Sequence, residues 1–172
     1  MTEPLIKVAD LAWGRIKSPD LDVQEEFLTN FGMIKVERTN DKLFMRGTGA
    51  SHHLHVTEKG DPGFVSLAFR ADNEDDLHKL AAEAESASGV EEIDEPGGGK
   101  RVRLTEPNGY TIEIVHGIEA VDEIPVERQS YNLGNIDKYK RANELWRRAA
   151  GPATVMRIGH GVIGTPKMHE CT

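Results

Sequence analysis

The sequence lacks the features typical of disulfide-rich, membrane, secreted and nucleic-acid-binding proteins. Its 172 residues include one cysteine, Cys171, which excludes internal disulfides and fits a reducing compartment. No apolar run approaches the roughly 18–20 residues that cross a bilayer, and the first residues lack the basic-then-apolar order of a signal peptide. Lysine and arginine number 21 against 29 aspartates and glutamates, a net charge of −8 that argues against nucleic-acid binding. We therefore expect a cytoplasmic protein with neither a nucleic-acid nor a membrane partner.

The residues that are present favour small modules with a shared core. Hydrophobic residues make up 38% of the chain and charged residues 29%, which is enough apolar material for a core. An alternating segment at 5–17 predicts a strand, Asp20 can cap a following helix, and Gly32 can end that helix in a left-handed turn. Three short strands are then expected, at residues 34–39, 42–47 and 52–58.

The same order of elements begins again at residue 63. A strand at 63–71 precedes a helix that starts near Asn73, where Asp76 offers a capping box. Three further strands are expected, at residues 89–95, 99–106 and 110–117.

Two short matches support a duplication. The tripeptide LAW at 11–13 lies 56 residues before LAF at 67–69, and the dipeptide DL at 20–21 lies 56 residues before DL at 76–77. A single β-α-β-β-β unit leaves one sheet face exposed, and pairing two units buries it. We predict an α+β fold of two tandem modules, residues 1–60 and 61–117.

The character of the chain changes after residue 117. Residues 118–155 predict a linker with one helix at 136–150. The sequence then becomes strand-like, and HGVIGTP at 160–166 has the spacing of WGRIKSP at 13–19. We expect residues 156–172 to begin a further, truncated module, so that the chain is the front half of a longer protein.

Two motifs carry a resemblance to a known family. The turn PDLD at 19–22 follows the first strand, and LTEPNGYTIEIV at 104–115 closes the second module. With the tandem β-α-β-β-β order, these resemble the vicinal oxygen chelate superfamily of glyoxalase I, bleomycin-resistance proteins and extradiol dioxygenases. The chain looks most like the N-terminal half of a catechol 2,3-dioxygenase-like protein. The resemblance implies a cupped, partly open mixed sheet.

The resemblance also implies a metal, Fe(II) in the dioxygenases, held by two histidines and a carboxylate inside the cup of a module pair. In residues 1–117 the ligand positions fall on Trp13, on Ser66 or its neighbour Val65, and on Glu113. Only Glu113 can bind a metal there. We therefore expect this pair to be metal-free, with no cofactor-binding or catalytic residue that can be assigned.

Two interpretations of Glu113 stay open. Its side chain faces the cup and pairs with a cation such as Arg101 or Arg103, or strand alternation turns it outward.

The histidines offer a second set of candidate ligands. His160 occupies the first-ligand position of the third unit. The resemblance therefore implies that it is the first metal histidine of the catalytic pair of modules. The alternative is a strand histidine that forms a hydrogen bond with a backbone partner. His52, His53 and His55 fall on one predicted strand, where two imidazoles two residues apart can bind a transition metal. We favour a solvated strand for these three.

The function implied by resemblance is O2-dependent cleavage of a catechol-type ring in the breakdown of aromatic compounds, with this chain as the non-catalytic half. The alternative is a metal-free, drug-sequestering protein in which Trp13 and Phe69 line an aromatic cup. A third possibility is an assembly domain whose cup is filled by its own side chains. A small aromatic molecule is the expected ligand. A homo-oligomer is expected because an unpaired half exposes apolar surface.

Overall fold

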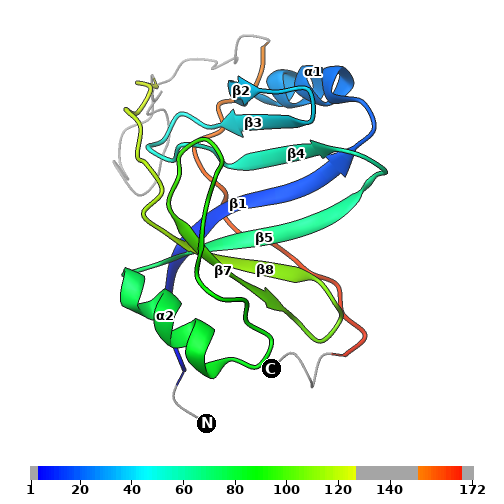
Figure 1. Cartoon of the computed structure of the whole chain (residues 1–172). Coiled ribbons are helices and arrows are strands. Elements are labelled where there is room, and N and C mark those ends of the chain that lie inside the picture. The colour runs from blue at the N-terminus through cyan, green and yellow to red at the C-terminus, as the bar shows by residue number, and fades with distance from the viewer. Residues whose placement is uncertain (1–3, 127–150, 168–172) are drawn as a thin grey trace, which may run out of the picture.

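The computed structural model describes residues 4–126 and 151–167. These residues form eight strands and two helices in two successive sets of strand, helix and three strands (Figure 1). The first set is β1 (Val8–Ser18), α1 (Leu21–Phe31), β2 (Ile34–Arg38), β3 (Lys42–Arg46) and β4 (His55–Lys59). The second set is β5 (Gly63–Ala71), α2 (Glu74–Glu83), β6 (Glu91–Glu92), β7 (Lys100–Thr105) and β8 (Thr111–His116). The predicted α+β class is confirmed.

All eight strands belong to one mixed sheet with the order β2-β3-β4-β1-β5-β8-β7-β6. Strand β1 pairs in parallel with β4, and β5 pairs in parallel with β8, so each set closes on its own first strand. The two sets meet where β1 and β5 run antiparallel, with Arg15 opposite Ser66. The resemblance implied a partly open sheet, and this is confirmed, because the sheet does not close into a barrel. The exact boundaries of the two modules stay a prediction.

Local sequence signals explain where the helices begin and end. The Asp20 carboxylate accepts hydrogen bonds from the backbone N–H groups of Asp22 and Val23, at 2.8 and 3.1 Å. Gly32 ends α1 at φ +108°, a conformation that favours glycine. Asn73 caps α2 by accepting from the Asp76 N–H at 2.9 Å. The three predicted caps are confirmed.

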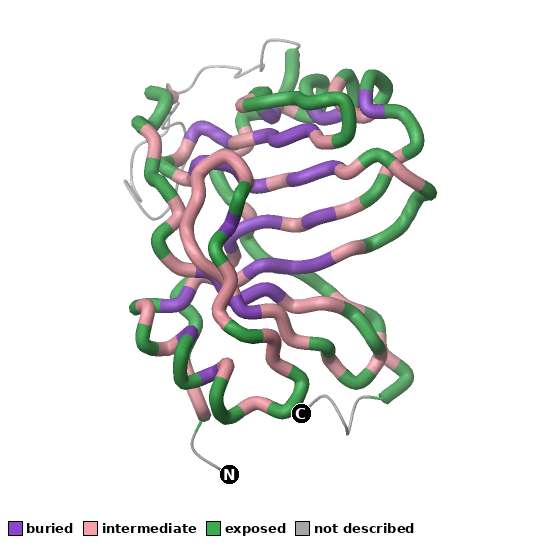
Figure 2. The backbone as a smooth tube through the Cα atoms, viewed as in Figure 1, coloured by how far each residue is buried: buried purple, intermediate pink, exposed green. Residues whose placement is uncertain are grey.

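The two faces of the sheet have different cores. Both helices pack on one face, the helix face, where Leu28 of α1 clusters with Leu43 and Met45 of β3. Alternate residues of the same strands point to the opposite face, the inner face. That face carries its own buried cluster, whose main members are Ala12, Trp13, Phe44, Val56, Ala68, Ile93 and Val115. Buried residues therefore run through the central strands (Figure 2).

Three predicted elements differ from the structure. Strand β4 begins at His55 rather than residue 52, and β6 has two residues rather than the expected 89–95. Residues 151–167 form neither helix nor strand, so the predicted strand at their centre is wrong. The segment crosses the strands instead of running alongside one of them, so no continuous ladder forms (Figure 1). Near its start the Thr48 N–H donates to the Val155 carbonyl, and at its end Lys167 Nζ donates to the Pro107 carbonyl.

Other expectations about this part of the chain are not tested. The helix predicted at 136–150 lies outside the described residues. The assignment of 156–172 as the start of a further module stays a prediction. Within the described residues, no helix has the length and apolar character that a membrane crossing needs.

Candidate functional site

The candidate site lies on the inner face, where β1, β5 and β8 are neighbours. The hydroxyl of Ser66 on β5 donates a hydrogen bond to Glu113 on β8, and both side chains are buried. These are two of the three positions that the resemblance assigns to metal ligands. The third, Trp13 on β1, is buried at 1% exposure, and its ring lies 4.6 Å from that of His53, centroid to centroid.

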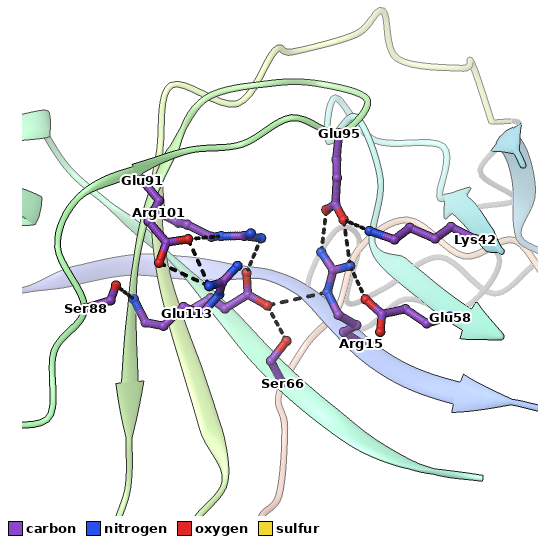
Figure 3. Close-up of polar contacts among 10 residues, drawn as sticks. Arg15, Lys42, Glu58, Ser66, Ser88, Glu91, Glu95, Arg101 and Glu113 are labelled. Atoms are coloured by element: carbon purple, nitrogen blue, oxygen red, sulfur yellow. Dashed lines mark hydrogen bonds and ion pairs between the residues drawn. The ribbon is translucent and has the colours of Figure 1, made fainter. Parts of the chain in front are cut away.

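The side chain that β1 supplies to the site is Arg15, which the sequence analysis did not single out. Its Nη1 donates to Glu58 at 2.9 Å and its Nη2 to Glu95 at 2.6 Å. Its Nε lies 3.5 Å from the nearer oxygen of Glu113 (Figure 3). Arginine two positions along the strand from Trp13, and so on the same face, is the signal that would have pointed to it.

Arg15 is held as a cation although it is almost fully buried. Burial alone would lower the pKa of Arg15, but its hydrogen bond to Glu95, the negative charges of Glu95 and Glu113 and the hydrogen bond to Glu58 raise it above the ordinary value. The guanidinium is therefore a permanent positive charge at the centre of the inner face.

Glu113 is buried, paired and surrounded by positive charge. Its side chain is 3% exposed, and its second oxygen lies 3.2 Å from Nη1 of Arg101. The expectation that it faces the cup and pairs with a cation is confirmed, and the outward orientation is wrong. Arg103 pairs instead with Glu91, at 2.9 Å.

The inner face is crossed by residues 93–99, which we call the strap; they connect β6 to β7 and pass over β1 (Figure 1). Ile93 packs into the inner-face core, and Glu95 pairs with both Arg15 and Lys42. Gly97 has φ +91°, and a side chain there would come within 2.9 Å of the His52 ring. The strap is thus held against the inner face at Ile93 and Glu95 and lies close to it at Gly97.

Glu95 is strongly biased towards its charged form. Burial raises the pKa of the carboxyl, but hydrogen bonds from Arg15 and Lys42 and their positive charges outweigh it and lower the pKa to about 2. Glu95 therefore joins β1 and β3 of the first set to the strap of the second set by charge-assisted hydrogen bonds.

A cavity of about 260 Å³ remains between the strap and the strands. Its lining includes Arg101, Arg103 and Thr111 besides the ion-paired Arg15 and Glu113. Because positive and negative groups there already pair with each other, the cavity presents a neutralised ion-pair network rather than a free set of ligands.

The residues present do not fit a metal held by two histidines and a carboxylate. The indole of Trp13 has no lone pair to donate, and the hydroxyl of Ser66 is engaged with Glu113. Two guanidinium groups lie within 3.5 Å of Glu113 and would repel a cation placed beside it. Among the described residues, no group of three histidine, cysteine, aspartate or glutamate side chains is arranged to hold a metal ion.

A protein-family model covers most of the two sets of elements. A model of the Glyoxalase/Bleomycin resistance protein/Dioxygenase superfamily matches residues 14–114. The chain belongs to this superfamily.

Two curated proteins show where in the superfamily the similarity lies. Metapyrocatechase of Geobacillus stearothermophilus is 29% identical over 163 residues, which cover 92% of this chain and 47% of that protein. The manganese-dependent 2,3-dihydroxybiphenyl 1,2-dioxygenase of Geobacillus genomosp. 3 is 29% identical over 126 residues, 69% of this chain and 39% of that protein. The chain thus spans less than half the length of these dioxygenase relatives.

Solved structures show the same fold. The Mn(II)-bound glyoxalase from Novosphingobium aromaticivorans superposes with a TM-score of 0.67 at 21% identity, over 72% of this chain and 44% of that one. Homoprotocatechuate 2,3-dioxygenase from Brevibacterium fuscum, in complex with 3,4-dihydroxyphenylacetate, gives 0.63 at 20% identity, over 70% and 40%.

His52 and His53 do not lie on the solvated strand that was expected from the sequence. His53 is 3% exposed and lies before β4, with its Nδ1 3.2 Å from that of His52 and its ring against Phe44. Burial, with the positive charges of His52 and Arg15, lowers the pKa of His53 to about 3. The expected solvated strand is therefore wrong for His52 and His53, because the segment before β4 folds onto the inner face.

His55 and His160 lie apart from this pair. His55, on β4, contacts the Thr57 hydroxyl at 2.8 Å, and burial lowers its pKa to about 4. His160 is exposed on the segment 151–167. Its role as a metal ligand stays a prediction.

The aromatic cup expected for a drug-sequestering protein is not formed. Trp13 lies in the inner-face core, whereas Phe69 packs on the helix face beside α2. The β1–β5 register explains this, because a shift between Leu11 and Trp13 sets Trp13 opposite Ala68 and leaves Phe69 opposite Leu11.

Proposed function

We propose that this chain is the N-terminal, metal-free half of an extradiol ring-cleaving dioxygenase-like protein. The observation that carries the proposal is the pair of guanidinium groups on Glu113, the one residue of residues 1–117 that matches a family ligand. The dioxygenase relatives, of which the chain matches less than half, support the assignment to one half.

In this proposal the half acts by packing against and shaping a catalytic half. The charged groups of the inner face pair with one another and with the strap, so this face offers a fixed surface rather than a reaction site. The catalytic half would take a catechol-type substrate, in keeping with the substrate named for the Brevibacterium fuscum enzyme. The assembly would be a homo-oligomer.

We further propose that His160 is the first metal ligand of that catalytic half. Its position matches Trp13 in the spacing of the two segments, and imidazole is a ligand of Fe(II). The metal would be Fe(II), although one relative is named as manganese-dependent, so Mn(II) must be tested beside it.

Metal retention by the 172-residue chain tests the metal-free part. The purified chain is loaded anaerobically with Fe(II) or Mn(II), desalted and measured by plasma mass spectrometry. We expect well below one ion per chain, with the same value for Glu113→Gln. Stoichiometric retention that Glu113→Gln abolishes would contradict the proposal.

Activity of a longer protein tests the remainder. A protein that continues through a second module pair should cleave catechols. We expect His160→Ala to lose both metal and ring cleavage, whereas Ser66→Ala keeps both. The reverse pattern would place the metal in the first pair. Tight catechol binding by the metal-free 172-residue chain would favour the drug-sequestering alternative.

A further inference from the structure

Three carboxylates from three separate parts of the chain converge on Arg15. Glu58 comes from β4, Glu95 from the strap and Glu113 from β8. Their oxygens lie 2.9, 2.6 and 3.5 Å from Nη1, Nη2 and Nε of the guanidinium, respectively (Figure 3). We propose that this is a latent divalent-cation site in which Arg15 is the resident cation. If the guanidinium is removed, the three carboxylates bind a hard divalent cation such as Mn²⁺ or Ca²⁺.

The charge around Arg15 favours a cation at this place. Without Arg15, the three carboxylates keep two partners, Lys42 on Glu95 and Arg101 on Glu113. One negative charge is then uncompensated. It falls on Glu58, whose side chain is 24% exposed and which lies beside the more deeply buried Glu95 and Glu113, at 9% and 3%. Excess negative charge among carboxylates that water reaches poorly is destabilising, so the variant gains stability from a cation that can enter.

The ligand chemistry selects hard divalent cations. Ca²⁺ and Mn²⁺ prefer carboxylate oxygens and complete their coordination with water, whereas sites for softer metals use imidazole or thiolate. The adjoining cavity of about 260 Å³ has room for such waters.

The arginine fills this position imperfectly. Its Nε is buried and makes no hydrogen bond with the described residues, although it forms an ion pair with Glu113 at 3.5 Å. Among the described residues, the native arrangement contains no ready-made group of three metal ligands. The inference therefore concerns the variant and predicts no metal for the native chain.

The exposed Arg38 provides a matched control. It also joins two carboxylates, Asp22 at 2.6 Å and Glu25 at 2.8 Å, but its side chain is 31% exposed and that of Asp22 is 84% exposed. Its removal leaves Glu25 paired with Lys35, and the carboxylate left without a partner is the solvated Asp22, so no cation is needed there.

The experiment compares the full 172-residue chain with Arg15→Met, Arg38→Met and the double variant Arg15→Met/Glu113→Gln. Thermal unfolding is followed in EDTA and in about 1 mM MnCl₂ or CaCl₂, and Mn²⁺ binding is measured by electron paramagnetic resonance. We expect the melting temperature of Arg15→Met to rise by about 5 °C or more with the ion. The native chain and Arg38→Met should shift by less than about 1 °C, and the double variant should lose most of the shift.

Several results would overturn the inference. A folded Arg15→Met chain that neither binds Mn²⁺ nor gains stability from it would do so, as would an equal shift in Arg38→Met. If Arg15→Met is insoluble in EDTA, recovery on refolding with MnCl₂ is the readout. Arg15→Lys is the second variant; it keeps a cation in place and should fold without a response to Mn²⁺, so Mn²⁺ binding by it would also overturn the inference.

The inference rests on the proposal that this half has no resident metal, and the two can fail separately. A metal retained by the native chain contradicts the proposed function. A native chain without metal, together with an unresponsive Arg15→Met, contradicts only the latent site.

Discussion

Glu95→Gln tests whether the strap is held by charge. The substitution keeps the size of the side chain but removes the negative charge that Arg15 and Lys42 share. The pKa of Glu95 falls from an ordinary 4.5 to about 2 in the folded chain. At about 1.4 kcal/mol per pH unit, this corresponds to roughly 3 kcal/mol. Because the carboxylate borders a cavity, we expect Glu95→Gln to lower the free energy of unfolding by about 2 kcal/mol at pH 7.

The sign of the pH dependence follows from the lowered pKa. A carboxyl group whose pKa is depressed by folding adds stability above its unfolded pKa and loses that contribution as the pH falls towards the folded value. The difference between the native chain and Glu95→Gln should therefore be constant above about pH 5. It should shrink between about pH 4.5 and pH 2.

The assay is urea denaturation followed by circular dichroism, at pH 7 and at steps down to the lowest pH at which the chain folds. Glu25→Gln is the matched control, because Glu25 also joins one lysine and one arginine, Lys35 and Arg38, but on the surface. Its cost should be below about 1 kcal/mol. Equal losses in the two variants, or a difference that does not shrink in acid, would refute the reasoning.

Two further predictions concern the inner-face core. Trp13→Ala should lower the free energy of unfolding by about 3–5 kcal/mol, because the ring is buried at 1% exposure. Phe27→Ala is the control: its ring is 60% exposed, so its loss should cost under about 1 kcal/mol. Urea denaturation of both variants checks this, and similar losses in the two would contradict it. His53 should stay neutral far below its ordinary pKa of 6.5, since burial and the charge of His52 lower it to about 3. Its ring signals in NMR should therefore not change between pH 7 and pH 4, and a midpoint near 6.5 would show that the ring is solvated. Because the unfolded chain binds this proton first, His53 also lowers stability progressively below about pH 6.5.

The regular elements were predictable because their signals are local. Asp20, Gly32 and Asn73 lie within a few residues of the backbone groups that they cap, and alternating apolar residues mark most of the strands. The cup-facing side of Glu113 was one of two alternatives, since alternation gives the phase of a strand but not which phase is buried. The strand-like pattern in 151–167 failed because a strand also needs a neighbour with which to pair.

The sequence by itself determined the order of the elements, the duplicated pattern and the family motif that contains Glu113, because each depends on residues close together in the chain. Only the tertiary structure decided what fills the inner face. Arg15 meets Glu58 and Glu95 across 43 and 80 residues of sequence, and a register shift between β1 and β5 places Trp13 and Phe69 on opposite faces. Such contacts follow from strand pairing and from the path of the strap, neither of which is encoded in the local spacing of residues.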